Sequence, residues 1–427
     1  MTINAKYDKI INNKDSYGEF MKKKKWIRFR HKITRDVVNV ILSPYMYIKY
    51  HIKATKYKEN LKEPYLIIYN HQTAFDQFFI GKSFKKPLYY LASEDLFSNG
   101  FISRVIEFLI KPIPIKKNVS DLTAVKKCIQ VVREGGSIAI APEGNRTFSG
   151  ETMNFNPAII KLVKLLKIPL LIYRIEGGYG VEPRWGHKLR KGKMKSYVYQ
   201  TVLPETYLKM TDEELGDLIK KGLYVNEHQS NELFKSKRKA EFLERVAYVC
   251  PKCGLTTFYS KGNVIRCTKC NLEVEYTDDK KFKPIDKISD FPFNNYLEWY
   301  NYQNDYVNNL DLTKYFDELM YTETGNFFIV HLYKHKERIS KDCTIKLYGN
   351  KVEIQTESND ENKYEFLFED ITGVSVLGRN KLNIYYKDNV YQIKSNKRFN
   401  AVKYLNIWYR FNNQIKNPDS DSKFLGL

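Results

Sequence analysis

The sequence predicts an α/β protein, with a central, mostly parallel sheet in its first half and a β-rich domain near its carboxyl end. Short apolar runs alternate with amphipathic stretches across residues 61–235, as they do in α/β domains. Beyond about residue 325, β-rich runs follow one another directly, and a single amphipathic helix closes them. With 427 residues, the chain is long enough for two or three domains.

Apolar runs and helix-ending residues predict the elements of the α/β domain, residues 61–235. A helix is expected over residues 122–133, because the Gly135-Gly136 pair would end it. Thr211 and Glu214 have the spacing of a capping box that opens a later helix. Four strands are predicted, at residues 64–69, 88–92, 137–141 and 169–175.

The carboxyl-terminal domain, residues 325–415, is predicted from β-rich runs and the turns between them. Gly349-Asn350 and residues 387–389 are turn signals that separate neighbouring runs. Strands followed by one closing helix, residues 399–411, resemble a pleckstrin-homology-like (PH-like) β-sandwich. The β-rich runs are residues 327–335, 343–356, 363–378, 381–386 and 390–395.

The chain is strongly basic, with 71 Lys and Arg against 49 Asp and Glu, a formal net charge of +22. Such a charge attracts nucleic acid, acidic lipid headgroups and phosphorylated small molecules alike.

In the leader, residues 1–60, a basic run at 22–32 precedes a short apolar stretch at 37–49. This stretch is too short to cross a bilayer, which needs about 18 to 20 apolar residues. We expect a helix lying in an anionic membrane interface, with a solvated basic face before a buried helix as the alternative. No signal peptide is expected at the N-terminus.

His71 and Asp76 form a candidate catalytic pair directly after a predicted strand, in the segment YNHQTAFD. On one helix, five positions would leave the two side chains about 140° apart. We therefore expect His71 on a loop and Thr73 as the cap of the helix that follows, so that Asp76 turns back toward the imidazole. An Asp on one ring nitrogen fixes the tautomer, and the other nitrogen can take a hydroxyl proton.

A second candidate segment, APEGNRTFSG at residues 141–150, also follows a predicted strand. Pro142 and Gly144 are expected to shape a tight turn that brings Glu143 and Arg146 to the edge of the sheet. The forked cation of Arg146 suits a phosphate. Ligands of open α/β sheets bind beyond the carboxyl ends of the strands, where both segments fall.

The two motifs, His-x4-Asp and Glu-Gly-x-Arg, resemble those of the glycerolipid acyltransferases, specifically the 1-acylglycerol-3-phosphate acyltransferase group. Residues 112–117, 155–158 and 168–175 also resemble blocks of this family. The resemblance implies that His71 is the general base on the acceptor hydroxyl and that Asp76 is its partner. Lys117 stands where the family usually has an Arg, and lacks its bidentate geometry. The implied acceptor site consists of Asn70, Lys117, Glu143, Gly144 and Arg146.

This resemblance implies a membrane-associated O-acyltransferase that acylates lysophosphatidate on the cytoplasmic face of a membrane as a peripheral protein. The donor would be acyl-CoA, acyl-carrier protein or acyl phosphate, and no catalytic cofactor is expected. Glycerol 3-phosphate, another lysophospholipid or a glycolipid are alternative acceptors. A second alternative is a non-catalytic protein that uses this scaffold to bind a membrane or nucleic acid, although nucleic acid is the less expected partner.

Four cysteines predict a zinc ribbon at residues 246–285. Each CxxC pair can form a tight turn, and four thiolates at about 2.3 Å close a tetrahedral Zn²⁺ site with a structural role. A redox dithiol is the alternative. We expect the ribbon and a helical connector, residues 286–324, to join the catalytic and carboxyl-terminal domains. The ligands would be Cys250, Cys253, Cys267 and Cys270.

Overall fold

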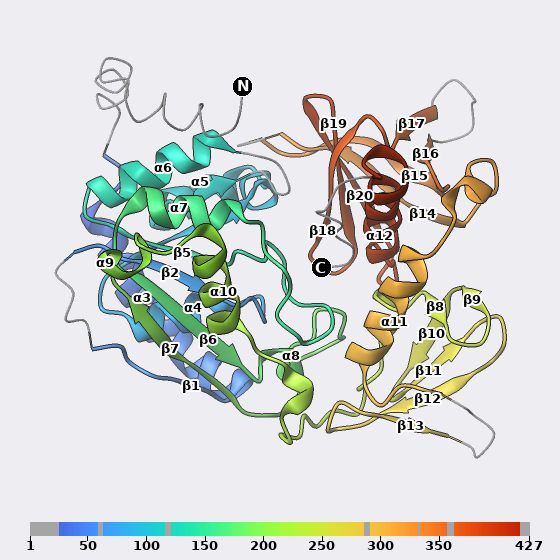
Figure 1. Cartoon of the computed structure of the whole chain (residues 1–427), viewed down its shortest axis with the longest axis horizontal. Coiled ribbons are helices and arrows are strands. Elements are labelled where there is room, and N and C mark those ends of the chain that lie inside the picture. Colours follow the sequence, from blue (N-terminus) through green and yellow to red (C-terminus); the bar gives the residue numbers. More distant parts are fainter. Residues whose placement is uncertain are drawn as a thin grey trace.

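The computed structural model describes residues 25–58, 63–115, 121–285, 291–331, 334–356 and 363–418. Figure 1 shows two parts, which we name the α/β part (residues 25–235, blue to green) and the second part (residues 246–418, yellow to red). The first 24 residues of the predicted leader and Lys117 lie outside the described residues.

The α/β part is built on one seven-stranded sheet with the order β1-β7-β6-β2-β5-β3-β4. Neighbouring strands run parallel except β6 and β7, which pair antiparallel. The predicted fold class, with a mostly parallel sheet, is therefore confirmed. The strands are β1 (Ile52–Ala54), β2 (Leu66–Tyr69), β3 (Leu88–Ser93), β4 (Ile113–Ile115), β5 (Ser137–Ile140), β6 (Leu170–Glu176) and β7 (Met194–Val202).

Helices cover both faces of this sheet, because the apolar side chains of its central strands point alternately to each side. In β2, Leu66 and Ile68 pack into one cluster with α6, α7 and α10, whereas Ile67 and Tyr69 pack into another with α3 and α4. The helices are α3 (Phe29–Tyr50), α4 (Asp76–Ser83), α5 (Phe101–Ile110), α6 (Leu122–Arg133), α7 (Ala158–Leu166), α8 (Gly178–Val181), α9 (Pro204–Tyr207) and α10 (Asp212–Leu223), with 3-10 turns at η1 (Glu94–Phe97) and η2 (Glu227–Gln229). A further 3-10 turn, η3 (Leu243–Arg245), follows the α/β part.

The second part begins with a small antiparallel module that carries the cysteines. Helix α11 (Tyr296–Asn308) packs on it, and Trp299 Nε1 donates to the Val249 carbonyl at 2.8 Å. The Gln303 side-chain oxygen accepts from the backbone N–H of Tyr248 at 2.7 Å, so the helix and the module are tied together. The strands are β8 (Val249–Cys250), β9 (Gly254–Leu255), β10 (Phe258–Lys261), β11 (Val264–Cys267), β12 (Glu273–Tyr276) and β13 (Phe282–Pro284).

The rest of the second part is a curled antiparallel sheet closed by helix α12 (Val402–Phe411), as the sequence predicted. Its order is β17-β16-β15-β14-β20-β19-β18, and α12 packs against β18. The 3-10 turn η4 (Leu312–Tyr315) precedes the sheet, and a π-helical turn (Asn412–Lys416) follows α12. The strands are β14 (Tyr321–Ile329), β15 (Glu337–Leu347), β16 (Lys351–Thr356), β17 (Lys363–Leu367), β18 (Ile371–Leu377), β19 (Lys381–Tyr386) and β20 (Asn389–Ser395).

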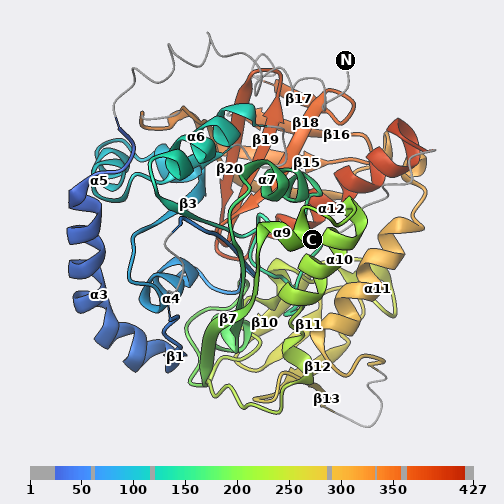
Figure 2. The same cartoon turned by 60° about the vertical axis from the view of Figure 1, so that its left-hand side comes forward.

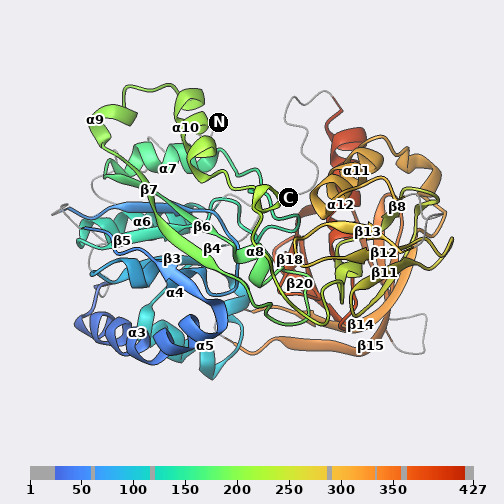
Figure 3. The same ribbon diagram turned by 90° about the horizontal axis from the view of Figure 1, so that it is seen from below.

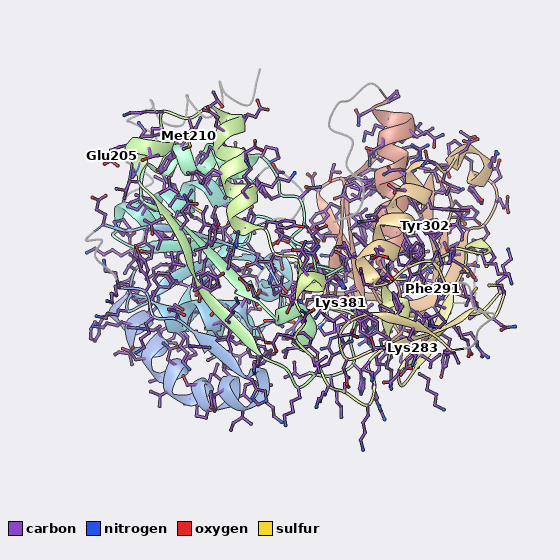
Figure 4. All side chains as sticks on the ribbon, turned by 60° about the horizontal axis from the view of Figure 1, so that its bottom comes forward. Glu205, Met210, Lys283, Phe291, Tyr302 and Lys381 are labelled. Atoms are coloured by element: carbon purple, nitrogen blue, oxygen red, sulfur yellow. The ribbon has the colours of Figure 1, made fainter. Side chains whose placement is uncertain are left out.

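The two parts meet through an acidic turn at the end of β3. The Asp95 carboxylate accepts from Lys381 Nζ at 2.6 Å and from Lys336 Nζ. The neighbouring Glu94 carboxylate accepts from Tyr385 Oη and from Asn383 Nδ2. Figure 4 labels Lys381 at this junction, between the two parts. The carboxyl-terminal sheet is therefore fastened to the α/β part by charged and polar side chains.

Most elements predicted from the sequence are present, and the differences lie at strand ends. The four predicted strands of the α/β part correspond to β2, β3, β5 and β6, and helix α6 has the predicted bounds of 122–133. Strand β14 begins at Tyr321, inside the range predicted for the helical connector, and ends at Ile329, before the end of the predicted run at 335. The boundaries proposed for the five regions stay predictions. Among the described residues, no helix has both the length and the apolar character required to cross a membrane.

Candidate active site

Asn70 fixes the start of the loop that carries His71. Its side-chain Nδ2 donates to the Ile175 carbonyl at 2.8 Å, and its Oδ1 accepts from the Ile175 backbone N–H at 2.8 Å. The fully buried Asn70 side chain thus extends the pairing of β2 with β6 by one step beyond Tyr69. The loop leaves the sheet at a defined point, so the structure places Asn70 beneath the site as a support.

The Asp76 carboxylate holds the His71 imidazole from the first residue of α4. His71 Nδ1 and Asp76 Oδ2 lie 2.7 Å apart, and the same oxygen accepts from the Gln72 backbone N–H at 2.7 Å. Asp76 Oδ1 accepts from both the backbone N–H and the hydroxyl of Thr73. A carboxylate only accepts, so Nδ1 carries the proton in the neutral ring and Nε2 is the basic nitrogen. Asp76 is fully buried, whereas 25% of the His71 side chain is exposed.

The expectation that Thr73 caps the following helix is wrong. Helix α4 begins at Asp76, its N-cap is Phe75, and no side chain caps it. The Thr73 hydroxyl instead accepts from the Phe75 backbone N–H at 3.1 Å and donates to Asp76. The Asp76 carboxylate accepts from backbone N–H groups of the preceding turn, and these bonds hold it beside the imidazole without a conventional N-cap.

The Glu143 carboxylate joins the second motif to the first through backbone groups. Its Oε1 accepts from the His71 backbone N–H at 2.8 Å, and its Oε2 accepts from the Met153 backbone N–H at 2.8 Å. The Thr147 backbone N–H also donates to the His71 carbonyl at 3.0 Å. Glu143 is buried, and burial raises its pKa to about 8. Both of its oxygens are occupied by the backbone, so in this structure Glu143 positions the loop that carries His71.

Gly144 and Arg146 complete the second motif. Gly144 has φ +68°, in the left-handed region that favours glycine, and its N–H donates to the Ala141 carbonyl at 3.1 Å. This turn carries Arg146 to the edge of the sheet, where its Nη1 lies 3.3 Å from Glu182 Oε1. The side chain of Arg146 is 11% exposed.

Glu182, which the sequence analysis did not single out, connects the parts of the site. Its Oε2 accepts from the Tyr50 hydroxyl at 2.9 Å and from the Ala74 backbone N–H at 3.3 Å, while Oε1 faces Arg146. Glu182 follows α8, just beyond the carboxyl end of β6. The one sequence signal that could have identified Glu182 is its place as an acidic residue soon after the end of β6, a third central strand. The structure brings Asn70, His71, Asp76, Glu143, Gly144 and Arg146 together at one edge of the sheet, and Lys117 lies outside the described residues.

The four cysteines converge at a second site. Their Sγ atoms all lie within 4.8 Å of one another. Cys250 and Cys270 are 3.6 Å apart, and Cys253 and Cys267 are 3.5 Å apart. A tetrahedral zinc site with bonds of about 2.3 Å has sulfur atoms about 3.8 Å apart. The Lys252 backbone N–H points at Cys250 Sγ at 3.4 Å, as in a thiolate turn, so the cluster fits a structural zinc ion.

Part of the chain is similar to known acyltransferases. The acyltransferase family model matches residues 48–175. A probable 1-acyl-sn-glycerol-3-phosphate acyltransferase of Mycoplasma genitalium is 26% identical over 148 residues, which are 33% of this chain and 54% of that protein. A 1-acyl-sn-glycerol-3-phosphate acyltransferase of Borreliella burgdorferi is 31% identical over 102 residues, 24% of this chain and 41% of that protein. The chain thus spans about half the length of the relatives that it matches, or less.

A solved structure is also similar in part. The 1-acyl-sn-glycerophosphate acyltransferase PlsC of Thermotoga maritima aligns with 51% of this chain and 89% of its own, with 18% identity and a TM-score of 0.38. The family match covers the His71–Asp76 pair, Glu143 and Arg146. These sequence matches therefore show an acyltransferase domain over residues 48–175, and the named relatives support the glycerolipid acyltransferase family for this part of the chain.

Proposed function

We propose that this chain is a membrane-associated O-acyltransferase that moves a fatty acyl group from an activated donor to the free hydroxyl of lysophosphatidate. The observation that carries this proposal is the His71–Asp76 pair, because Glu182 joins the loop between these two residues, at the Ala74 backbone N–H, to Arg146. The reaction needs a base for a hydroxyl and a cation for a phosphate, and this site offers both. The names of the relatives support lysophosphatidate as the acceptor.

In this proposal, His71 Nε2 takes the proton of the acceptor hydroxyl while Asp76 holds the other ring nitrogen. The hydroxyl oxygen attacks the acyl carbonyl carbon, a carbon–oxygen bond forms, and the bond to the donor's leaving group breaks. The proton then passes from His71 to that leaving group. A thioester of coenzyme A or acyl-carrier protein, or an acyl phosphate, supplies the acyl group.

Two adjacent helices support attachment to a membrane. Helices α3 and α5 lie side by side on the outer edge of the α/β part (Figures 2 and 3), and Arg30 Nε donates to the Phe108 carbonyl at 2.7 Å between them. Exposed basic residues flank the apolar surface, including Lys32, Lys49 and Arg104. The exposed apolar side chains are Phe29, Ile33, Val37, Val40, Ile41, Tyr45, Tyr47 and Ile48 on α3, and Phe101, Ile102, Val105, Phe108, Leu109 and Ile110 on α5.

We assign this apolar face to the interface of an anionic bilayer, on the cytoplasmic side, with the protein attached peripherally. Exposed apolar patches of this extent mark interaction sites, and basic residues at the rim favour acidic headgroups. The double variant Ile41→Glu, Phe108→Glu is expected to stay in solution when the wild type sediments with vesicles of anionic phospholipid. Leu233→Glu, at another exposed apolar residue, is the matched control and should sediment like the wild type.

In the same proposal, the four cysteines bind a structural zinc ion, and the ribbon takes no part in the acyl transfer. Four thiolates leave no open position for substrate.

The experiment that tests the activity compares the wild type with His71→Ala, using labelled lysophosphatidate and each class of acyl donor. We expect product from the wild type and a loss of at least a hundredfold in the variant. His331→Ala, which removes a half-buried His paired with Glu337, should keep full activity. If the wild type transfers the acyl group only to glycerol 3-phosphate, another lysophospholipid or a glycolipid, that molecule replaces lysophosphatidate as the proposed acceptor. Equal transfer by His71→Ala and wild type would refute the mechanism.

A further inference from the structure

The turn between β18 and β19, residues 378–380, lies against the loop that carries Arg146. Arg184 joins the two: its Nη2 donates to the Val376 carbonyl at 2.6 Å, and its Nη1 donates to the Arg146 carbonyl at 3.1 Å. Its Nε lies 3.4 Å from the Gly378 carbonyl. Arg184 is only 4% exposed, so this contact is an integral part of the packed structure. The carboxyl-terminal sheet therefore reaches the edge of the candidate active site.

Arg379, at the middle of this turn, faces the same carboxylate oxygen as Arg146. Its Nη2 lies 3.7 Å from Glu182 Oε1, while Arg146 Nη1 lies 3.3 Å from that oxygen. Its Nη1 donates to the His187 carbonyl at 3.2 Å. The Arg379 side chain is 37% exposed, compared with 11% for Arg146. Two guanidinium groups from opposite parts of the molecule thus converge on one acidic side chain.

The charges at this contact do not balance. Arg146, Arg184 and Arg379 bring three positive charges, and the carboxylate that the described ion pairs place among them is that of Glu182. Like charges held close together in a partly buried site are unfavourable unless an anion joins them. Burial lowers the pKa of Arg379, and the nearby Arg146 lowers it further while Glu182 opposes the change. A phosphate monoester carries about two negative charges near neutral pH and would offset this excess.

Arg379 adds one hydrogen bond between the two parts, to the His187 carbonyl, but their attachment does not depend on it. The junction already has the Asp95–Lys381 and Asp95–Lys336 pairs, and buried Arg184 holds the turn by its backbone. The 3.7 Å separation from Glu182 is long for a hydrogen bond, so the guanidinium of Arg379 keeps capacity for a ligand.

We propose that Arg379 binds the phosphate of the acceptor together with Arg146, so that the carboxyl-terminal sheet completes the acceptor site of the α/β part. This inference rests on the proposed function for the identity of the acceptor. Two forked cations that face the same oxygen of Glu182 suit the separate oxygens of one phosphate group.

The test compares Arg379→Ala and Arg379→Lys with the wild type in the full chain. Arg338→Ala is the matched control, because Arg338 is an exposed arginine of the same sheet, on β15. The measurements are KM and kcat for lysophosphatidate, calorimetric binding of glycerol 3-phosphate as a probe, and thermal unfolding. We expect Arg379→Ala to raise KM and the dissociation constant about tenfold to a hundredfold, with kcat changed about twofold or less. Arg379→Lys should recover part of the affinity, and Arg338→Ala should match the wild type.

The outcomes separate this inference from the proposed function. Arg379→Ala could instead have the same KM and glycerol 3-phosphate affinity as Arg338→Ala and only a lower unfolding temperature. Arg379 would then be an interface residue, and the inference would be overturned. A wild type that binds glycerol 3-phosphate through Arg379 but transfers no acyl group would retain the phosphate site and reject the proposed reaction. A wild type that shows neither binding nor transfer would overturn both.

Discussion

The candidate active site and the cysteine module differ in the groups that surround their reactive side chains. At the active site, buried acidic groups bind backbone N–H groups: Asp76 binds those of Gln72 and Thr73, and Glu143 binds those of His71 and Met153. In the cysteine module, the sulfur atoms of Cys253 and Cys267 instead face each other at 3.5 Å. The fold itself organises the first site, whereas in our proposal a structural zinc ion would hold the four thiolates of the second together.

Metal removal should have the largest effect, and it should act first on the cysteine module. Binding of a structural zinc ion contributes on the order of 10 kcal/mol to such modules. We expect a strong chelator, or Cys267→Ser, to unfold residues 246–285 and expose them to protease, because Cys267 is fully buried. Metal content and limited proteolysis measure this. Cys343→Ser, at a buried cysteine outside the cluster, is the control and should keep the metal. A wild type without bound metal would show that the cysteine module is not organised by a metal ion.

Asp76→Asn should come next, and it tests whether the fold sets the tautomer of His71. If the amide turns its N–H₂ toward Nδ1, Nε2 carries the proton and cannot act as a base; the opposite orientation keeps the tautomer but sets the N–H₂ against the Thr73 backbone N–H. We expect kcat to fall about 10³- to 10⁴-fold with metal content unchanged. Asp36→Asn, at an exposed ion pair on α3, is the control. Full activity of Asp76→Asn would mean that the imidazole is oriented by other contacts.

Glu143→Gln should give a smaller effect on stability and on rate. Glutamine has one acceptor oxygen, so its N–H₂ would face the backbone N–H of either His71 or Met153. We expect the free energy of unfolding to fall by roughly 2 to 3 kcal/mol, with a lower kcat because His71 shifts. Denaturant unfolding measures the first and steady-state kinetics the second. Glu151→Gln, which loses only an exposed contact with Tyr224, should leave both nearly unchanged.

The smallest effect concerns the charged contact between the two parts. Burial alone would raise the pKa of Asp95, but Lys381 and Lys336 outweigh it and lower the pKa to about 2. A lowered carboxyl pKa stabilises the fold above the ordinary value of about 4, and this contribution is lost as the pH falls toward 2. Asp95→Asn should therefore unfold more easily than the wild type at pH 7, by up to about 2 kcal/mol, and the difference should shrink below pH 4. A difference that did not depend on pH would assign the loss to packing.

Local patterns predicted much of the fold, because they act through neighbouring residues. The apolar runs of β2, β5 and β6 and the Gly135-Gly136 end of α6 are short-range signals. Strand β7 escaped prediction because its sequence, MKSYVYQTV, mixes apolar and polar residues, and because it lies near the edge of the sheet, where it is only partly buried. The cysteine spacing predicted the cluster for the same local reason.

The candidate site was predicted only where it is encoded in motifs. His71 and Asp76 are five positions apart, so their contact follows from one turn. Glu182 and Arg379 lie in segments without a motif, and their contact depends on how two distant parts pack. Sequence reasoning also gave Glu143 a role toward substrate, whereas its oxygens bind backbone groups, a detail that only the tertiary structure reveals.

The bond between Arg184 and Val376 spans 192 positions of the chain, and this has a consequence for synthesis. At about 5–20 residues per second, a ribosome adds Val376 roughly 10 to 40 seconds after Arg184. During that interval the emerging α/β part holds an arginine that can bond the Arg146 carbonyl but whose other carbonyl partners, those of Val376 and Gly378, do not yet exist. A polypeptide released early would thus retain His71 and Asp76 but lack the Val376 and Gly378 carbonyls that hold Arg184, and its proposed acceptor site would be open on one side.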